Sequence, residues 1–260
     1  MDLPAPGAPP RAELPLGGAA GWRVGGRAVR VERGPADWRV WSWPVAATGP
    51  LQLLPEPGEP PPTAERARFA WSRSGGVVHV GPSLPDRALV LLPECPVQVG
   101  PDDALTFTVT LPAWVRVAVE AGPVLCEAAP ERLPETWLGT DTRTGELCYG
   151  SRSRWSLAPG PPLGAWGVRC PVRVANRGAA PLLLQRLRVP APALPLWWDE
   201  GQVWAPLLHI EGDADDRVSV TVAEGPPAQA PRAVPFAPPR VPADAARSWL
   251  AFHALFRRSS

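Results

Sequence analysis

Few residues in this 260-residue chain have the type and spacing that chemistry requires. The three histidines, His79, His209 and His253, lie far apart, so the H-x-x-x-H pair of a helical zinc site is absent. The chain contains no lysine, which excludes Schiff-base chemistry and a phosphate-binding loop that depends on lysine. It also has no G-x-S-x-G nucleophile elbow. The sequence therefore predicts no catalytic residue, no metal site and no cofactor, and we expect a protein that is not an enzyme.

Carboxylates are the remaining candidates for catalysis. The 25 acidic residues could supply two carboxylates that meet from distant strands, as in a glycosidase. The acidic run Glu211–Asp216 is followed at once by Arg217, without the spaced oxygen ligands and the later glutamate of a calcium loop. We interpret this run as a solvated hairpin turn. A carboxylate-based hydrolase stays as a minor alternative function.

The cysteines and the apolar segments indicate the cellular compartment of the protein. The cysteines are Cys95, Cys126, Cys148 and Cys170, and none forms a C-x-x-C pair, so we predict four reduced and mostly buried thiols. The start of the chain shows neither the basic nor the apolar region of a secretion signal. No stretch reaches the ~18 uninterrupted apolar residues of a membrane span. We expect a cytoplasmic protein with no membrane span.

Charge and aromatic content indicate which classes of binding partner are expected. The formal net charge is +1, which provides no global field to attract nucleic acid, so we expect no nucleic-acid partner. The 13 tryptophans and the 45% of hydrophobic residues exclude wholesale disorder. Trp197 and Trp198 are adjacent, so in a strand they would face opposite sides. Core filling is the simpler interpretation of the tryptophans, and stacking on a sugar or on a protein partner is the alternative.

The elements that must position these residues are strands. Apolar residues alternate with polar ones in Leu105–Thr110, Val115–Glu120 and Val218–Val222, as in strands with one buried face. Strand candidates recur about every ten residues, which favours an all-β, antiparallel β-sandwich, with two packed sandwich-like halves as a variant. The predicted strands are 22–32, 38–45, 67–80, 87–92, 96–99, 104–111, 113–120, 123–128, 145–157, 167–175, 182–189, 202–210 and 217–223.

Proline clusters and one helical pattern set the predicted domain bounds. Proline removes a backbone donor, so its clusters mark segments outside central strands. Near the end of the chain, Trp249, Phe252 and Phe256 recur at helical spacing, which predicts an amphipathic helix that packs on its own domain. The predicted parts are a mobile proline-rich tail over 1–18, a β-sandwich domain over 19–225, a proline-rich linker over 226–242 and the docked C-terminal helix over 243–258.

The segment from Glu135 to Arg154 is the most distinctive one, E-T-W-L-G-T-D-T-R-T-G-E-L-C-Y-G-S-R-S-R. It resembles the hallmark of an uncharacterised prokaryotic family, domain of unknown function 432. The pattern of that family is close to T-W-F-G-x-x-x-x-G-E-L-C-Y followed by a basic stretch, and Leu138 replaces its phenylalanine here. Further stretches that resemble the family are Leu105–Val117, Val172–Pro190 and Trp249–Phe256, so the resemblance spans roughly residues 20–256 and implies one domain.

The resemblance implies little chemistry, because it brings no activity and no catalytic residue. It implies a link to small-conductance mechanosensitive channels, as genomic neighbours or fusion partners, and hence an accessory role. We therefore expect a non-enzymatic β-sandwich protein that binds a protein partner. The alternative is a module that binds a carbohydrate or a small ligand.

The physical pattern of the same segment indicates two strands around a polar loop that Gly139 and Gly145 bracket. If Leu147 and Tyr149 face the core, then alternation places their neighbours Glu146 and Cys148 outside, near Arg152 or Arg154. A Glu–Arg pair there is either structural or part of a recognition patch. The candidate interaction residues are Trp137, Gly139, Gly145, Glu146, Cys148, Tyr149, Arg152 and Arg154.

Overall fold

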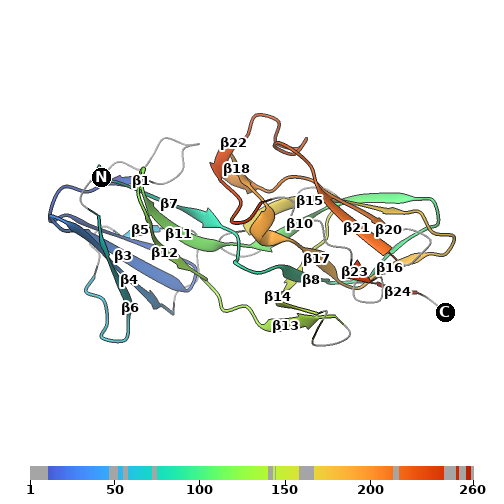
Figure 1. Ribbon diagram of the computed structural model, residues 1–260, viewed down its shortest axis with the longest axis horizontal. Helices are drawn as coiled ribbons and strands as arrows, with labels where there is room; N and C mark the ends of the chain where they lie inside the picture. The colour runs from blue at the N-terminus through green and yellow to red at the C-terminus, as the bar shows by residue number, and fades with distance from the viewer. Residues whose placement is uncertain are drawn as a thin grey trace. The chain divides into compact units, whose positions relative to one another are not determined.

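A computed structural model shows that the protein is built almost entirely of β-strands (Figure 1), so the predicted all-β class is confirmed. Among the described residues the one helical element is η1, a three-residue 3₁₀ turn at Ala191–Ala193. No helix in this part of the chain is long and apolar enough to cross a membrane. The structure describes residues 11–46, 52–54, 58–71, 75–139, 143, 145–157, 167–212, 217–242, 250–251 and 256–258.

The chain divides into two compact units that alternate along the sequence. Unit 1 comprises residues 1–83, 113–132 and 164–166, and unit 2 comprises 84–112, 133–163 and 167–260. The predicted 19–225 domain is therefore divided between both units. A single continuous boundary could not be read from the sequence, because strands of one unit interrupt the other.

Unit 1 holds two antiparallel sheets, one of five strands in the order β5-β2-β3-β4-β6 and one of four strands in the order β1-β7-β11-β12. Alternating apolar side chains give each sheet one apolar face, and both faces contribute to a single core. Trp22 and Trp38 enter this core from the first sheet, and Val80, Val117 and Leu125 enter it from the second. The strands are β1 Arg11–Glu13, β2 Ala19–Val24, β3 Arg27–Arg33, β4 Asp37–Pro44, β5 Gln52–Leu54, β6 Glu65–Ala70, β7 Val77–Ser83, β11 Trp114–Val119 and β12 Val124–Ala128.

Unit 2 holds three sheets. Their orders are β22-β18-β19-β15-β20-β21-β23 with β10 also on β15, then β13-β14-β8-β17, and β24-β16-β9. The strands are β8 Leu89–Pro93, β9 Val97–Val99, β10 Ala104–Pro112, β13 Glu135–Leu138, β14 Glu146–Ser153, β15 Gly167–Asn176, β16 Leu182–Leu184, β17 Leu187–Val189, β18 Leu196–Asp199, β19 Gln202–Trp204, β20 Leu208–Gly212, β21 Arg217–Val222, β22 Val234–Ala237, β23 Leu250–Ala251 and β24 Phe256–Arg258.

Three strand pairs of unit 2 are parallel, which differs from the wholly antiparallel prediction. β14 runs parallel to β8, and β15 runs parallel to both β19 and β20. Parallel neighbours need a long crossover connection, whereas adjacent runs joined by a turn signal only antiparallel hairpins. The sequence pattern could therefore indicate the strands but not these pairings.

Several predicted strands are in fact two strands. The predicted strand over 22–32 is the hairpin β2–β3, whose turn contains Gly25 with a φ of 53°. A positive φ is a conformation that glycine adopts without steric cost, so this residue permits the tight turn. The predicted strand over 67–80 is likewise divided into β6 and β7, and those over 182–189 and 202–210 are each divided in two.

Both proline-rich ends contain strands. Within the predicted 1–18 tail, β1 pairs with β7, and Leu14 beside it is only 2% exposed. Within the predicted 226–242 linker, β22 pairs with β18, and the buried Ala230 packs against Trp204. The predicted helix over 243–258 is not confirmed: its described residues belong to strands β23 and β24, and the rest lies outside the described residues.

Candidate functional site

The most distinctive segment of the sequence forms an antiparallel hairpin of β13 and β14 in unit 2. Trp137 lies opposite Leu147, and Leu138 lies opposite Glu146. β13 is the end strand of its sheet among the described residues, and β14 continues into the sheet by pairing with β8. Gly139 has a φ of 142° where the chain leaves β13. Residues 140–142 and 144 of the loop lie outside the described residues.

The condition that Leu147 and Tyr149 face the core is not met in the structure. Cys148 is fully buried, whereas Leu147 is 39% exposed and Tyr149 is half-buried. Trp137, the cross-strand neighbour of Leu147, is 43% exposed. The sequence could not decide which face packs inwards, because both sets of alternating side chains include apolar residues. Alternation then gives the period of the strand but not the face that packs inwards.

Glu146 is bound by an arginine that the sequence did not indicate. Arg188 of β17 donates from Nε to Oε2 of Glu146 over 2.7 Å and from a terminal nitrogen to Oε1 over 3.0 Å. The Arg188 side chain is only 7% exposed and that of Glu146 is 39% exposed, so this bidentate pair is shielded from water on the side of Arg188. Of the two arginines that were expected nearby, Arg154 instead lies 3.6 Å from Glu94. Arg152 is exposed and lies opposite Leu92 of β8.

The thiol of Cys148 is in an environment that suppresses reactivity. Burial raises its pKa to about 12, and the negative charge of Glu146 acts in the same direction. Because the thiolate is the nucleophilic form, a thiol with this pKa stays protonated and inert near neutral pH. Among the described residues there is also no group of three or more histidines, cysteines or acids that could hold a metal ion.

An arginine and a tyrosine border the exposed apolar pair. The guanidinium of Arg87 lies 5.3 Å from the ring centroid of Tyr149 and donates to Glu135 over 2.7 Å. The hydrogen bond to Glu135 raises the pKa of Arg87, so Arg87 stays positively charged. The indole of Trp137 lies directly over Gly145, where a Cβ atom would overlap it. We call Trp137, Leu147, Tyr149, Arg87 and Glu135 the hairpin surface.

A second candidate surface lies on the outer face of the five-stranded sheet in unit 1. Arg39 and Trp41 on β4 lie opposite Arg68 and Arg66 on β6. These four side chains, with Ala67, line a concavity of about 370 Å³. We call the four residues the arginine face. Trp41 belongs to a group of closely spaced tryptophans, but the sequence did not indicate this surface, because the register that joins two distant strands is not visible in one sequence.

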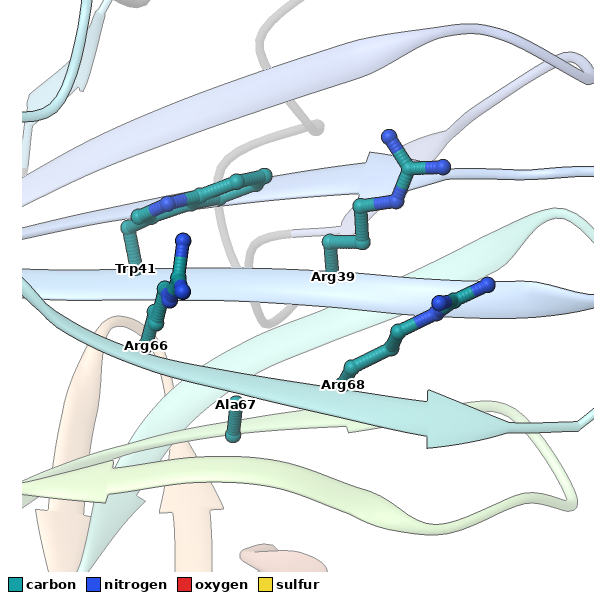
Figure 2. A pocket seen from close by; sticks show the side chains of 5 residues that line it. All are labelled: Arg39, Trp41, Arg66, Ala67 and Arg68. Carbon is teal, nitrogen blue, oxygen red and sulfur yellow. The ribbon is translucent and has the colours of Figure 1, made fainter.

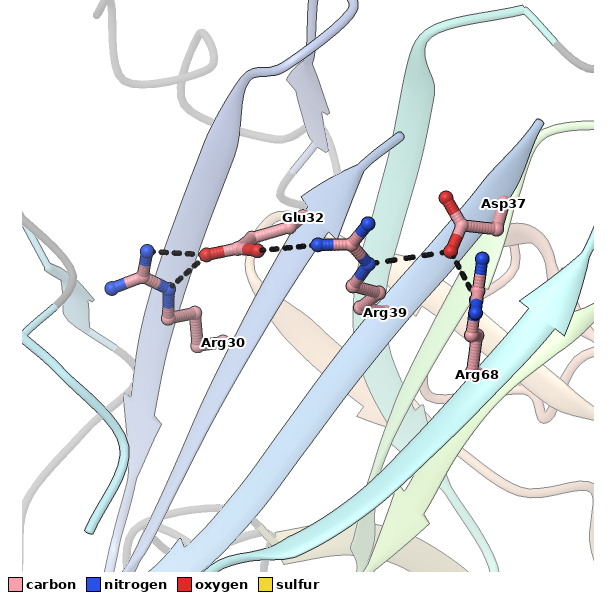
Figure 3. Close-up of polar contacts among 5 residues, drawn as sticks. All are labelled: Arg30, Glu32, Asp37, Arg39 and Arg68. Atoms are coloured by element: carbon pink, nitrogen blue, oxygen red, sulfur yellow. Dashed lines mark hydrogen bonds and ion pairs between the residues drawn. The ribbon is translucent and has the colours of Figure 1, made fainter. Parts of the chain in front are cut away.

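A chain of ion pairs orders this face (Figure 3). Glu32 accepts from Nε of Arg30 over 3.1 Å and lies 4.0 Å from Arg39. Asp37 accepts from Nε of Arg39 over 3.2 Å and also from Nε of Arg68. The Asp37 side chain is only 5% exposed. Its burial raises the pKa of the carboxyl, but the hydrogen bonds from Arg68 and Arg39 outweigh this, so the pKa lies below its ordinary value.

Fold and surfaces together define an all-β protein with two candidate contact surfaces. The chain matches the family described as "Protein of unknown function (DUF432)" over residues 13–255, and it belongs to this family. The resemblance drawn from the Glu135–Arg154 segment is therefore confirmed, and the match covers nearly the whole chain. No curated protein and no solved structure matches the chain.

Proposed function

We propose that this chain is a non-enzymatic accessory protein that binds another protein through the hairpin surface. The observation that carries the proposal is the exposed apolar pair of Trp137 and Leu147, which are cross-strand neighbours with 43% and 39% of their surface exposed. Adjacent exposed apolar side chains with a polar border are typical of protein interaction sites. Tryptophan, tyrosine and arginine are also the residue types that dominate the binding energy of such sites.

The framework proposed for this surface is a pair of sandwich-like halves. Unit 1 supports this interpretation, because its two antiparallel sheets contribute to one core. In unit 2 the hairpin is braced through β14 by β8 and by the Glu146–Arg188 pair. A braced hairpin would present Trp137 with little loss of conformational entropy on binding, which favours affinity.

The proposed partner is a small-conductance mechanosensitive channel, the class with which the family resemblance associates the chain. The proposed compartment is the bacterial cytoplasm. Four free cysteines fit a reducing compartment. A sugar-binding module would need a row of exposed tryptophans. Among the described residues, the exposed tryptophans Trp71 and Trp137 lie in different units.

The experiment compares the proteins of the native host that bind to the wild type and to two variants. The test variant carries Trp137→Ser and Leu147→Ser. The matched control carries Trp71→Ser, which removes a tryptophan that is equally exposed, at 42%, from unit 1. Each tagged protein is purified from native membranes and cytosol, and bound proteins are quantified by mass spectrometry. Equal melting temperatures verify that the variants are folded.

We expect the wild type and the Trp71→Ser control to enrich the same channel. The double variant should lose it about tenfold or more, because truncation of a side chain that dominates an interface costs about 2 kcal/mol or more. If all three proteins retain the same partners in the same amounts, the hairpin surface is not the binding site and the proposal fails.

A further inference from the structure

The arginine face has the geometry of a small-ligand site. Figure 2 shows Arg39, Trp41, Arg66 and Arg68 on one side of the sheet, with Ala67 pointing away from them. The four side chains come from two neighbouring strands, which fixes their spacing. Arg66 and Arg68 are two residues apart on β6, so their Cα atoms are about 7 Å apart. The concavity of about 370 Å³ falls within the usual range for small-molecule sites, roughly 300–1,000 Å³.

The hydrogen bonds of this face orient its arginines without using up their donors. Asp37 accepts from the Nε atoms of Arg39 and Arg68, and a guanidinium has further N–H groups on its terminal nitrogens. Within the described residues the terminal nitrogens of Arg68 have no hydrogen bond and Arg66 has no ion pair. A buried carboxylate thus holds two guanidinium groups through their Nε atoms and leaves the terminal N–H groups of Arg68 for a ligand.

The charge of this face favours an anion. Together with its neighbour Arg30 on β3, the face has four arginines against the two adjacent carboxylates of Glu32 and Asp37. Arg39 and Arg68 are direct cross-strand neighbours, and like charges in this position are destabilising. Asp37 offsets part of that repulsion. The stability of the sheet alone does not explain why the remaining repulsion between the arginines is retained. An anionic ligand would offset this repulsion.

Trp41 adds a second kind of contact. It is half-buried, lines the concavity and lies opposite Arg66 in the strand register. An indole in a fixed position can stack on a planar ring, an interaction that tolerates many ring types. The pairing of one indole with two outward guanidinium groups therefore suits a ligand with both a flat ring and an anionic group.

We propose that the arginine face binds a phosphate ester that carries a planar ring, the chemistry of a nucleotide. The phosphate contacts the terminal nitrogens of Arg66 and Arg68, since guanidinium groups match phosphate oxygens in bidentate hydrogen bonds. The ring stacks on Trp41. Arg39 contributes charge, and Asp37 acts as a positioning residue through its hydrogen bonds to Arg39 and Arg68. This site is independent of the proposed partner binding at the hairpin surface.

Isothermal titration tests this proposal with AMP, adenosine, inorganic phosphate and a ten-nucleotide single-stranded DNA as separate ligands. The test variants are Arg66→Gln with Arg68→Gln, and Trp41→Leu. Arg154→Gln with Arg177→Gln is the control, because it removes the same charge from two exposed arginines of unit 2. Arg66→Gln alone serves as a milder variant, and circular dichroism verifies folding. The single strand distinguishes a free nucleotide from a nucleic acid.

We expect AMP to bind the wild type and the control variant equally, and to bind the double arginine variant about tenfold or more weakly, since hydrogen bonds to charged groups carry the contact. Trp41→Leu should weaken AMP binding and leave phosphate binding unchanged. The proposal is overturned if AMP shows no binding at millimolar concentration, or if it binds the arginine variant like the wild type. It is also overturned if phosphate binds as tightly as AMP, or if the single strand binds more than about tenfold tighter than AMP.

Discussion

Glu146 and Arg188 link the hairpin surface to the interior of its sheet. Arg188 is nearly fully buried, and the carboxylate of Glu146 contacts it through two hydrogen bonds. A buried charge is costly when its partner is removed, because desolvation is then no longer offset. The pair therefore acts as a structural brace at one end of β14, next to the exposed side chain of Leu147.

Replacement of Glu146 by glutamine should lower the free energy of unfolding by about 2 kcal/mol. This is below the usual 3–5 kcal/mol for a fully buried pair, because the Glu146 side chain is 39% exposed. Urea denaturation at neutral pH measures the change. Glu94→Gln is the control, since Glu94 and Arg154 are both well exposed and 3.6 Å apart, and it should cost less than about 0.5 kcal/mol. Equal losses in the two variants would contradict the structural role of the pair.

At the scale of residues, the sequence predicted which residues lie on the hairpin but not which distant residues they contact. Trp137, Glu146 and Tyr149 do lie together on one hairpin, as the spacing of the segment indicated. The partner of Glu146 is 42 residues away on β17, and a single sequence holds no signal for a contact over that distance. The ordinary alternation of β14 likewise gave no basis for choosing Cys148 as the buried residue.

Within the hairpin, Gly145 permits the position of the Trp137 indole. The indole lies where the Cβ of any other residue would be, so glycine permits the ring to rest on the strand. Gly150 differs, because a Cβ there would meet Pro134 and Thr136 at 3.7 Å, an ordinary contact distance. The two glycines of β14 and its loop thus form a matched pair for a test of ring position.

Gly145→Ala should displace the indole of Trp137 and leave the fold intact. The ring can move outwards because Trp137 is 43% exposed, so we expect a loss of less than about 1 kcal/mol in the free energy of unfolding. Nuclear magnetic resonance of the indole N–H groups detects the displacement, with the Trp137 signal assigned through Trp137→Phe. In Gly150→Ala the same signal should stay in place. An unmoved signal in Gly145→Ala would show that the ring does not rest on the glycine.

At the scale of elements, alternation predicted most strands but merged several pairs of successive strands. β10 and β11 lie within a residue of their predicted bounds, because each has regular alternation of apolar and polar residues, and a turn sequence also precedes β10. The strands β2 and β3 were merged because the two-residue turn at Gly25 and Gly26 is short and apolar residues flank it closely. The end strand β22 was missed, since a short strand with exposed residues has no periodic pattern to detect. β13 was indicated only by the polar loop that follows it, not by alternation.

The two units of the molecule are interleaved in sequence, because residues of unit 2 lie between two paired strands of unit 1. β7 ends at Ser83, and β11 begins at Trp114 directly opposite it. The residues between these positions belong to unit 2, apart from Ala113. In unit 1 the strands β7 and β11 are therefore antiparallel neighbours whose ends a short turn could join.

A shortened protein in which a glycine-containing turn replaces residues 84–112, and which ends at Arg132, should fold by itself. It keeps both sheets and the whole core of unit 1. Circular dichroism should show a β-rich spectrum with a cooperative thermal transition. A protein of residues 1–83 alone lacks Val117 and Leu125 of the core and should not fold. If the shortened protein is unfolded while the complete chain is folded, unit 1 does not have a self-sufficient core.

At the scale of the whole molecule, the central proposal is that the protein acts by binding a protein partner through one surface of unit 2. Photo-crosslinking in living cells of the native host tests this claim most directly. A benzophenone amino acid replaces Leu147 of the hairpin surface in one variant and Leu16 of unit 1 in another. Leu16 is the more exposed of the two, at 65% against 39%, so chance collisions would favour it. We predict a discrete adduct with one protein from position 147 and none from position 16. No adduct from position 147, or the same adduct from both positions, would contradict the account.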